Sequence, residues 1–520
     1  AYYWFGSGSK SPPRQIDPVS PALRAAEVFP LLRGRLKDPD AQVRAEACIG
    51  LGRLGNVPAP LDQRAEGRPD NLVARELIAI LNDTANQANH GLVHQSATLG
   101  IGISKDEAAC AWLLGNLDKL SADEKGYAYI AFGLARYAPA IPTLLADLPR
   151  SSRGRATTDE NLAALHALGL YGPDYVDEIN KDDRNGIKEI ERLVDTRGDA
   201  AVVGQAIATL ARLQVEQRTV EKAFSAKTNE IQWTSLLALA NYSANEDMAS
   251  DAAKALMTRG WKSGKGQSKN FTILALGEMA GRLDPNSKTR SSILKFLKDE
   301  GLDTKDNYVR SSAALALAMA NDPTAVPAIA DLLQDTTVDD QVVAAASLAL
   351  GLLRATDYAD LIQREVLDKK NWKPDARGYG LLGLALMGDT TRMPDIMKIV
   401  NSRPPKETER QMSLAVGVLG EQDAVRPLVG FFSSEWKTNK TYLASNAAYG
   451  LGWMRDQSAV AALEKLVNSP HAMVRAMACV ALGYVGESDR VNPLARCYEN
   501  LSYRNDFGGW DLLVALANIL

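Results

Sequence analysis

Two histidines four residues apart are the strongest candidates for chemistry in this sequence of 520 residues. His90 and His94 fall on one predicted helix, where this spacing puts both imidazole rings on the same face and within reach of one metal ion. Neither is followed by a Glu in the manner of a zinc protease, and only His166 and His471 remain as further histidine ligands. We therefore expect no metal, and we assign His94 to a polar position in a groove.

Other signatures of catalysis are missing from the sequence. No segment has the form GxxxxGK(S/T) of a phosphate-binding loop, and Gly264-Lys265-Gly266 has no predicted strand before it. The four cysteines form no CxxC pair, and we interpret Cys48 as a buried free thiol. The sequence therefore predicts a protein that is not an enzyme, has no cofactor and takes no small-molecule substrate.

Charge and hydropathy limit the partners. The chain has 59 Lys and Arg against 63 Asp and Glu, for a net charge of −4, which argues against nucleic acid as a partner. No apolar run reaches the ~18 residues of a transmembrane helix, so any membrane contact is peripheral. Residue 1 is Ala rather than Met, so two locations stay open: the cytoplasm, or the periplasm or cell envelope after removal of a signal peptide.

The elements that carry these residues are helices of one recurring type. From Val474 to Gly486, apolar residues recur with a helical period, small residues let a second helix come close, and Gly486 ends the helix. Asp489 suits the cap of the next helix and Pro493 its first turn. One helix, a tight turn and the start of a second helix form the unit.

The same unit recurs through the chain at a spacing of mostly about 30 to 42 residues, which is the period of helical-pair arrays. Its small residue near the helix end stands at Gly52, Gly102, Ala135, Gly169, Ala211, Ala240, Gly277, Ala318, Gly351, Ala385, Gly417, Gly452 and Gly483. The sequence therefore predicts an all-α fold, an α-solenoid in which each unit buries its apolar face against its neighbours.

The pattern Val-Arg-x-x-Ala-Ala-x-Ala-Leu-Gly-x-x-Gly, then Asp, then x-Val-x-Pro-Leu, resembles the HEAT repeat. More narrowly, it resembles the short HEAT-like repeats of phycobilisome lyases, and residues 305–335, 405–432 and 470–500 match best. The resemblance implies a right-handed superhelix of about 13 to 14 helical pairs, with the Val-Arg helices on its concave side. It also implies protein–protein scaffolding far more often than catalysis.

The Arg of this pattern has two interpretations. It stands at Arg44, Arg310, Arg377 and Arg475, while other repeats have residues such as His94 and Tyr127 at this position. In the first interpretation these arginines pair with acidic side chains of neighbouring repeats and form a structural ladder. In the second, the groove is a surface adapted to one partner, and its predicted binding residues are Arg44, His94, Tyr127, Arg310, Arg377 and Arg475.

The first 20 residues differ in composition from the rest. The aromatic residues Tyr2, Tyr3, Trp4 and Phe5 precede a Gly/Ser/Pro stretch, which predicts a flexible arm that either covers the first repeat or docks on a partner. We expect less regular repeats over 21–265, regular repeats over 266–504 and a capping helix over 505–520.

These features predict a non-catalytic scaffold or structural subunit that binds a protein partner, or copies of itself, through the groove, the loops and the arm. A bilin-lyase-like enzyme or accessory is an alternative that the repeat type implies. An envelope-associated structural protein is a second alternative. HEAT-like enzymes that hydroxylate a modified lysine build a di-iron site from His-Glu pairs, and this sequence has no His-Glu dipeptide.

Overall fold

The computed structural model describes most of the chain up to residue 388. The described ranges are 24–64, 69–83, 91–149, 159–181, 185–195, 197–263, 266–369 and 371–388, with single helical positions at 394, 411, 415, 418, 460–461, 463–464, 478 and 481–482. The predicted aromatic arm, Arg475 and the predicted capping helix 505–520 lie outside these residues. The chain divides into two compact units, the first including Ala1–Gly100 and the second formed by Ile101–Leu419.

The described helices of the first unit begin with a helical pair and continue into a second pair. They are η1 (Arg24–Val28), α2 (Phe29–Arg35), α3 (Ala41–Leu54), the short turn η2 (Leu61–Gln63), α4 (Leu72–Asn82) and the first part of α5 (Leu92–Ser104). Asp40 starts α3 by accepting a 2.7 Å hydrogen bond from the backbone N of Gln42, and Gly55, at φ +78°, ends it. Helix boundaries in this unit therefore follow from capping residues in the sequence.

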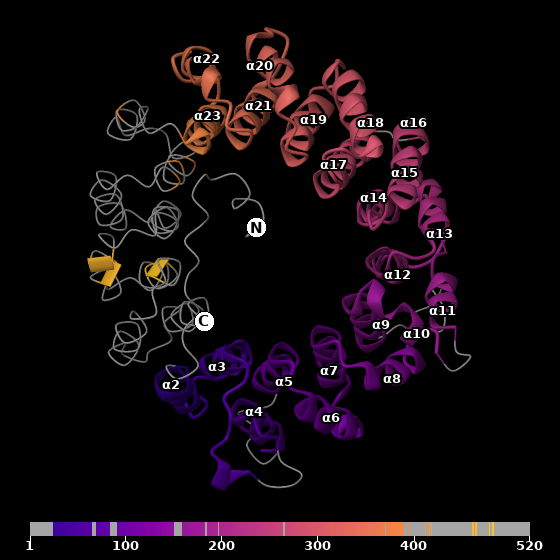
Figure 1. The fold of residues 1–520 in the computed structure, drawn as a ribbon, viewed down its shortest axis with the longest axis vertical. Coiled ribbons are helices and arrows are strands. Elements are labelled where there is room, and N and C mark those ends of the chain that lie inside the picture. The colour runs from indigo at the N-terminus through magenta and orange to yellow at the C-terminus, as the bar shows by residue number, and fades with distance from the viewer. Residues whose placement is uncertain are drawn as a thin grey trace. The chain divides into compact units, whose positions relative to one another are not determined.

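The second unit contains two rows of helices (Figure 1). The inner row consists of α7 (Ala122–Ala135), α9 (Asp159–Tyr171), α12 (Ala200–Leu213), α14 (Asn229–Ala238), α17 (Gln267–Arg282), α19 (Asn307–Met319), α21 (Asp340–Leu352) and α23 (Pro374–Met387). Each inner helix packs against the next one along the chain. This succession of contacts is what a repeat array requires.

The outer row is made of shorter helices and single turns. Its α-helices are α6 (Glu107–Gly115), α8 (Ile141–Ala146), α10 (Val176–Ile179), α11 (Gly186–Arg192), α13 (Gln217–Lys222), α15 (Glu246–Ala255), α16 (Trp261–Ser263), α18 (Lys288–Phe296), α20 (Val326–Gln334) and α22 (Ala359–Ile362). Short 3-10 or π turns extend them or join the rows: η4 (Leu117–Lys119), η5 (Ala138–Ala140), η6 (Pro173–Tyr175), η7 (Ala223–Ser225), η8 (Leu239–Asn241), η9 (Leu256–Gly260), η10 (Leu297–Leu302), η11 (Pro323–Ala325), η12 (Thr356–Tyr358) and η13 (Gln363–Leu367).

Glycines at the predicted small positions allow the helix backbones to approach one another. A Cβ added at Gly52 would lie 2.6 Å from the Cα of Gly100 in α5. A Cβ at Gly351 in α21 would lie 2.7 Å from the Cα of Gly383 in α23. Real Cβ atoms do not come this close to backbone, so a larger residue at either position would force the two helices apart.

The prediction of an all-α solenoid is confirmed. In the described part of the chain every regular element is helical, apart from one isolated bridge between Pro58 and Asn71. No helix among the described residues is both long and apolar enough to span a bilayer. Cys48 and Cys110 are buried free thiols, and burial raises the pKa of each to about 12, so both are protonated and unreactive at neutral pH.

Candidate functional site

Each inner helix of the second unit has one face that no other described helix of this unit covers. The preceding and following inner helices cover two sides, and the outer row covers a third. On α19 the partly or fully exposed apolar positions are Tyr308, Leu315 and Met319, which recur at helical spacing and so lie on one face. We call the corresponding surface of α7 to α23 the inner face.

The inner face is apolar over most of its length. Its half-buried or exposed apolar side chains come from all inner helices except α12: Tyr127, Ile130 and Leu134; Leu162 and Leu170; Trp233 and Leu237; Phe271 and Leu274; Tyr308, Leu315 and Met319; Leu348 and Leu352; Tyr379, Leu382 and Leu386. Tyr308 is 61% exposed, and Tyr127 and Leu237 are each 36% exposed. Apolar side chains exposed on seven helices in one row are typical of a site that binds another molecule.

Two aromatic side chains on this face are held in fixed positions. The rings of Trp233 (α14) and Phe271 (α17) lie with centroids 5.1 Å apart. The indole Nε1 of Trp233 donates a 3.2 Å hydrogen bond to Ser268 Oγ, which in turn donates to Gln232 Oε1 at 2.7 Å. Because these contacts fix the rings before any partner binds, little side-chain entropy is lost on binding.

A polar cluster interrupts the apolar face between α9 and α12. Gln205 Nε2 donates to His166 Nδ1 at 3.0 Å, and Arg212 Nη1 lies 3.4 Å from the same nitrogen. Because both neighbours are donors, Nδ1 must be the acceptor, and the neutral ring carries its proton on Nε2. Burial, followed by the positive charge of Arg212, lowers the pKa of His166. The cluster therefore offers neutral and cationic hydrogen-bond donors within an apolar surface.

The lowered pKa of His166 predicts that the folded state becomes less stable in acid. As the pH falls through 6.5, the unfolded chain binds a proton at this residue before the folded chain does, so stability falls with pH. We expect the free energy of unfolding to drop more between pH 7.5 and pH 5.5 in the wild type than in His166→Gln. Urea unfolding at both pH values measures this difference. Equal drops in the two proteins would show that the folded-state pKa of His166 is not lowered.

Two of the predicted groove arginines bind backbone carbonyls of the segment that precedes their own helix. Arg44 is buried, and its Nη1 donates to the carbonyl oxygens of Asp38 at 2.7 Å and Pro39 at 3.1 Å. Arg377 Nη2 donates to the carbonyl oxygen of Leu367 at 3.0 Å. Both side chains fix the turn that leads into their helix, which is a structural role. Their binding role stays a prediction.

The third described arginine of the pattern pairs with an acidic side chain directly after the next outer helix, α20. Arg310 Nη2 lies 2.6 Å from Asp335 Oδ2. Hydrogen bonds from the side chain and backbone of Thr337, with a further contribution from Arg310, lower the pKa of Asp335 to about 2. By the unit defined from the sequence, Asp335 belongs to the same helical pair as Arg310, so this contact does not extend from one repeat to the next.

The two remaining described groove residues, Tyr127 and His94, differ in their exposure to solvent. Tyr127 lies on the inner face, where its ring is part of the apolar surface. His94 on α5 is buried, and its possible metal partner His90 lies outside the described residues. Within the described ranges, no group of three or more His, Cys, Asp or Glu side chains is placed to hold a metal ion.

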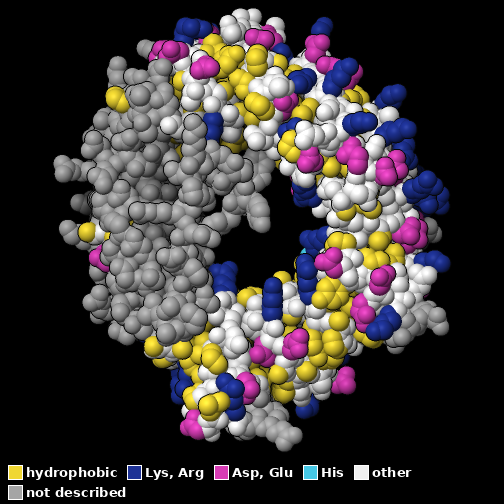
Figure 2. All heavy atoms as spheres, in the orientation of Figure 1, with side chains coloured by type: hydrophobic (Ala, Val, Ile, Leu, Met, Phe, Trp, Pro, Cys, Tyr) yellow, Lys and Arg dark blue, Asp and Glu magenta, His cyan; other side chains and the backbone are white. Residues whose placement is uncertain are grey.

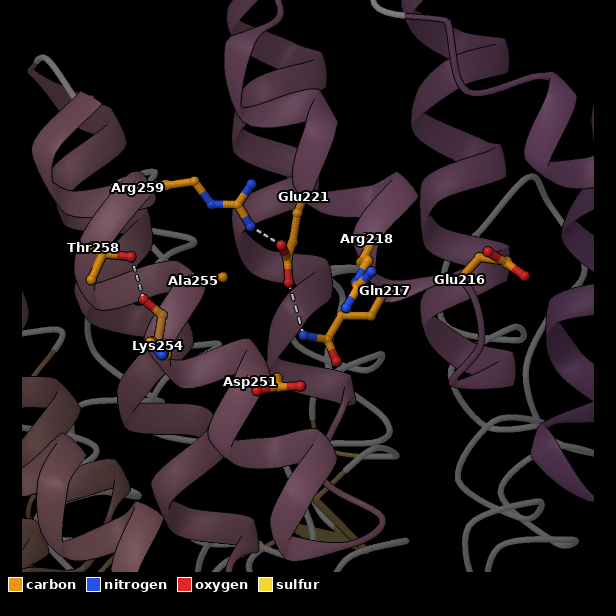
Figure 3. Close-up of a pocket in the computed structure, with 9 residues that line it drawn as sticks. All are labelled: Glu216, Gln217, Arg218, Glu221, Asp251, Lys254, Ala255, Thr258 and Arg259. Atoms are coloured by element: carbon orange, nitrogen blue, oxygen red, sulfur yellow. Dashed lines mark hydrogen bonds and ion pairs between the residues drawn. The ribbon is translucent and has the colours of Figure 1, made fainter.

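A separate hollow of about 420 Å³ lies in the outer row, between α13 and the segment formed by α15 and η9 (Figure 3). Glu221 pairs there with Arg259 and accepts a 2.8 Å hydrogen bond from Gln217 Nε2. The lining residues are Glu216, Gln217, Arg218, Glu221, Asp251, Lys254, Ala255, Thr258 and Arg259. Because the lining carries both signs of charge and the Glu221–Arg259 pair links two repeats, we interpret it as a structural contact.

Family models match three segments of the chain. The model for HEAT repeats matches residues 436–504, that for the HEAT repeat matches 28–57, and that for the PBS lyase HEAT-like repeat matches 309–335. The predicted resemblance is thereby confirmed, and no curated protein sequence matches the chain. The fold and these matches define the chain as a HEAT-repeat α-solenoid.

Solved structures with some likeness to the chain include two enzymes. One is human deoxyhypusine hydroxylase in complex with glycerol, at 17% identity and TM-score 0.25 over 52% of this chain and 96% of that one. The other is the complex of CpcE and CpcF of phycocyanin lyase from Nostoc sp. PCC7120, at 18% identity and TM-score 0.33 over 48% of this chain and 92% of that one.

A third similar structure is the karyopherin Kap121p bound to Pho4p, at 12% identity and TM-score 0.40 over 89% of this chain. The chain spans about half of the Kap121p chain, since the match covers 53% of it. TM-scores this low do not establish a common fold, so the assignment rests on the helices and the family models.

Proposed function

We propose that this protein is a non-catalytic scaffold that binds a protein partner through the inner face of its second unit. The observation that carries the proposal is the row of partly exposed apolar side chains on α7, α9, α14, α17, α19, α21 and α23, which is interrupted only by the polar cluster at α12. A surface of this kind loses contact with water when a partner covers it, and burying large apolar and aromatic side chains supplies most of the binding energy of protein interfaces.

Tyr127 belongs to this surface and enters the proposal directly. Arg44, Arg310 and Arg377 support it by fixing turns and repeats, and His94 lies buried in α5. Contacts of Arg475 and of the aromatic residues 2–5 with a partner remain predictions. The HEAT-repeat matches favour protein binding as the class of function, because such repeats present extended surfaces.

Affinity purification of the full chain from its native source, followed by mass spectrometry and mass photometry, tests this proposal. The expected result is a stable complex with one protein or with further copies of the chain. The matched comparison is a chain with Tyr127, Leu237 and Tyr308 replaced by Ser, which should yield the same monomer without the complex. A monomeric wild type with no stable partner would contradict the proposal.

A bilin-lyase-like enzyme or accessory is the second candidate. One observation favours it, namely the match of residues 309–335 to the PBS lyase HEAT-like repeat. This candidate predicts that the purified protein binds a bilin and gains visible absorbance. The scaffold proposal predicts no change in the visible spectrum when a bilin is added.

A further inference from the structure

Four exposed arginines stand where inner helices end. Arg136 directly follows α7, Arg212 lies in the last turn of α12, Arg282 is the last residue of α17 and Arg354 follows α21 by two residues. The intervening helices α9, α14 and α19 end instead in uncharged residues. Because the inner helices are corresponding helices of successive repeats and each packs against the next, their C-terminal ends lie along one edge of the inner face. We call these four residues the arginine row.

Two side chains of the row, Arg282 and Arg212, reach over neighbouring helices. Arg282 Nη1 lies 3.1 Å from Asn241 Oδ1 and 3.4 Å from the carbonyl oxygen of Ala240, at the end of the α14–η8 segment. Arg282 also pairs with Glu278. Arg212 reaches His166 on α9. Figure 2 shows Lys and Arg side chains along the inner edge of the second unit from α7 to α17.

Capping of helix ends explains part of this arrangement. The C-terminal end of a helix carries partial negative charge, and a nearby Arg is favourable there. Each guanidinium has five donors, however, and all four side chains remain exposed. The positive charge of the exposed row is therefore accessible to a partner on the inner face.

The opposite edge of the inner face has the opposite charge. Asp199, Asp306 and Asp339 cap α12, α19 and α21, and α7, α9, α14 and α23 have an acidic residue in their first turn. The inner face is therefore an apolar surface with a basic edge and an acidic edge. A bare polyanion would fit this surface poorly, because it would meet apolar side chains and then the acidic edge.

We infer that the partner segment is amphipathic and has an apolar stripe flanked on one side by Asp or Glu. This inference rests on the proposed function. Its apolar side chains contact the inner face, and its carboxylates face the arginine row. The His166–Arg212 cluster lies where such a carboxylate would cross from the edge onto the face. This arrangement sets the orientation of the segment as well as its composition.

The test uses the full chain and a phage-displayed library of random 16-residue peptides as the probe. The inference predicts that the wild type selects peptides rich in both large apolar and acidic residues. A chain with Arg136, Arg212, Arg282 and Arg354 replaced by Gln should select apolar peptides without the acidic excess. A matched control replaces the exposed outer-row residues Arg218, Lys222, Lys254 and Lys288 by Gln, which changes the net charge equally and should select like the wild type.

One selected peptide is then labelled and titrated by fluorescence anisotropy. We expect the arginine-row variant to bind it roughly fivefold or more weakly, and the outer-row control to bind it as the wild type does. Wild-type affinity should also fall as salt rises from 50 to 500 mM, a measurement that does not depend on the folding of any variant.

The outcomes separate this inference from the proposed function. Selection of apolar peptides with no acidic excess, or affinity independent of salt and of the arginine row, overturns the inference and leaves the apolar face as a binding site. Peptides that bind equally well to the chain with Tyr127, Leu237 and Tyr308 replaced by Ser would overturn the proposed function itself.

Discussion

Replacing Gly351 by Ala is expected to destabilise the array between α21 and α23. The added methyl group would lie 2.7 Å from the Cα of Gly383, and backbone at this position cannot move without separating the two helices. Overpacking of this kind costs about 3 kcal/mol of unfolding free energy or more, well above the small gain in helix propensity from Gly to Ala. Hydrogen exchange of α21 and α23, together with thermal unfolding, measures the effect.

Gly115→Ala is the matched control for this substitution. Gly115 is the exposed last residue of α6, and a Cβ added there meets no atom within 4 Å. We expect its effect on the unfolding free energy to stay within about 1 kcal/mol, in the stabilising direction. Equal hydrogen-exchange rates of α21 and α23 in the two variants would show that the close approach at Gly351 does not stabilise the contact between these helices.

The second large effect is expected on binding rather than on folding. Replacing Tyr127, Leu237 and Tyr308 together by Ser removes the three most exposed large apolar side chains of the inner face. Exposed substitutions of this kind change unfolding free energy by about 0.5 kcal/mol or less each. At the centre of an interface, by contrast, losing a single anchor costs about 2 kcal/mol or more. The triple variant should therefore bind the co-purified partner at least about 30-fold more weakly.

Leu61→Ser controls for the loss of exposed apolar surface in general. Leu61 is 82% exposed but belongs to the loop between α3 and α4 of the first unit and is not part of the α7–α23 row. Biolayer interferometry with the purified partner should give Leu61→Ser the affinity of the wild type. A triple variant that binds as tightly as this control would place the binding surface elsewhere.

The packing of the repeats was predictable because it depends on local features of the sequence. Gly52, Gly102, Gly277 and Gly351 were identified from spacing alone, and in the structure each faces the backbone of the next helix. A side chain larger than that of Gly does not fit at such a contact. A Gly at this position of the repeat therefore indicates that another helix backbone packs against it. Capping residues such as Asp322, whose side chain accepts from Thr324 N at 3.1 Å, report helix starts in the same way.

The candidate surface was less predictable. The Val-Arg positions lie beside the inner face, and the contacts of Arg44 and Arg377 with carbonyls depend on the path of the preceding turn, which no spacing rule gives. Helices such as α9 are apolar on nearly all sides, so sequence does not distinguish a leucine packed in the array from one on the open face. Tyr127 was identified because an aromatic residue stands at the Arg position, and Tyr308 was missed because it lies two residues before it.

Site-specific photocrosslinking tests the central claim most directly. A benzoylphenylalanine is placed at position 237 or 308 on the inner face, and at position 222 or 288 on the outer row, in the full chain within its native cells. The account predicts that both inner positions crosslink to the same protein, that neither outer position does, and that the purified chain loses this protein when Tyr127, Leu237 and Tyr308 become Ser. Crosslinks to that protein from the outer positions alone would contradict the account.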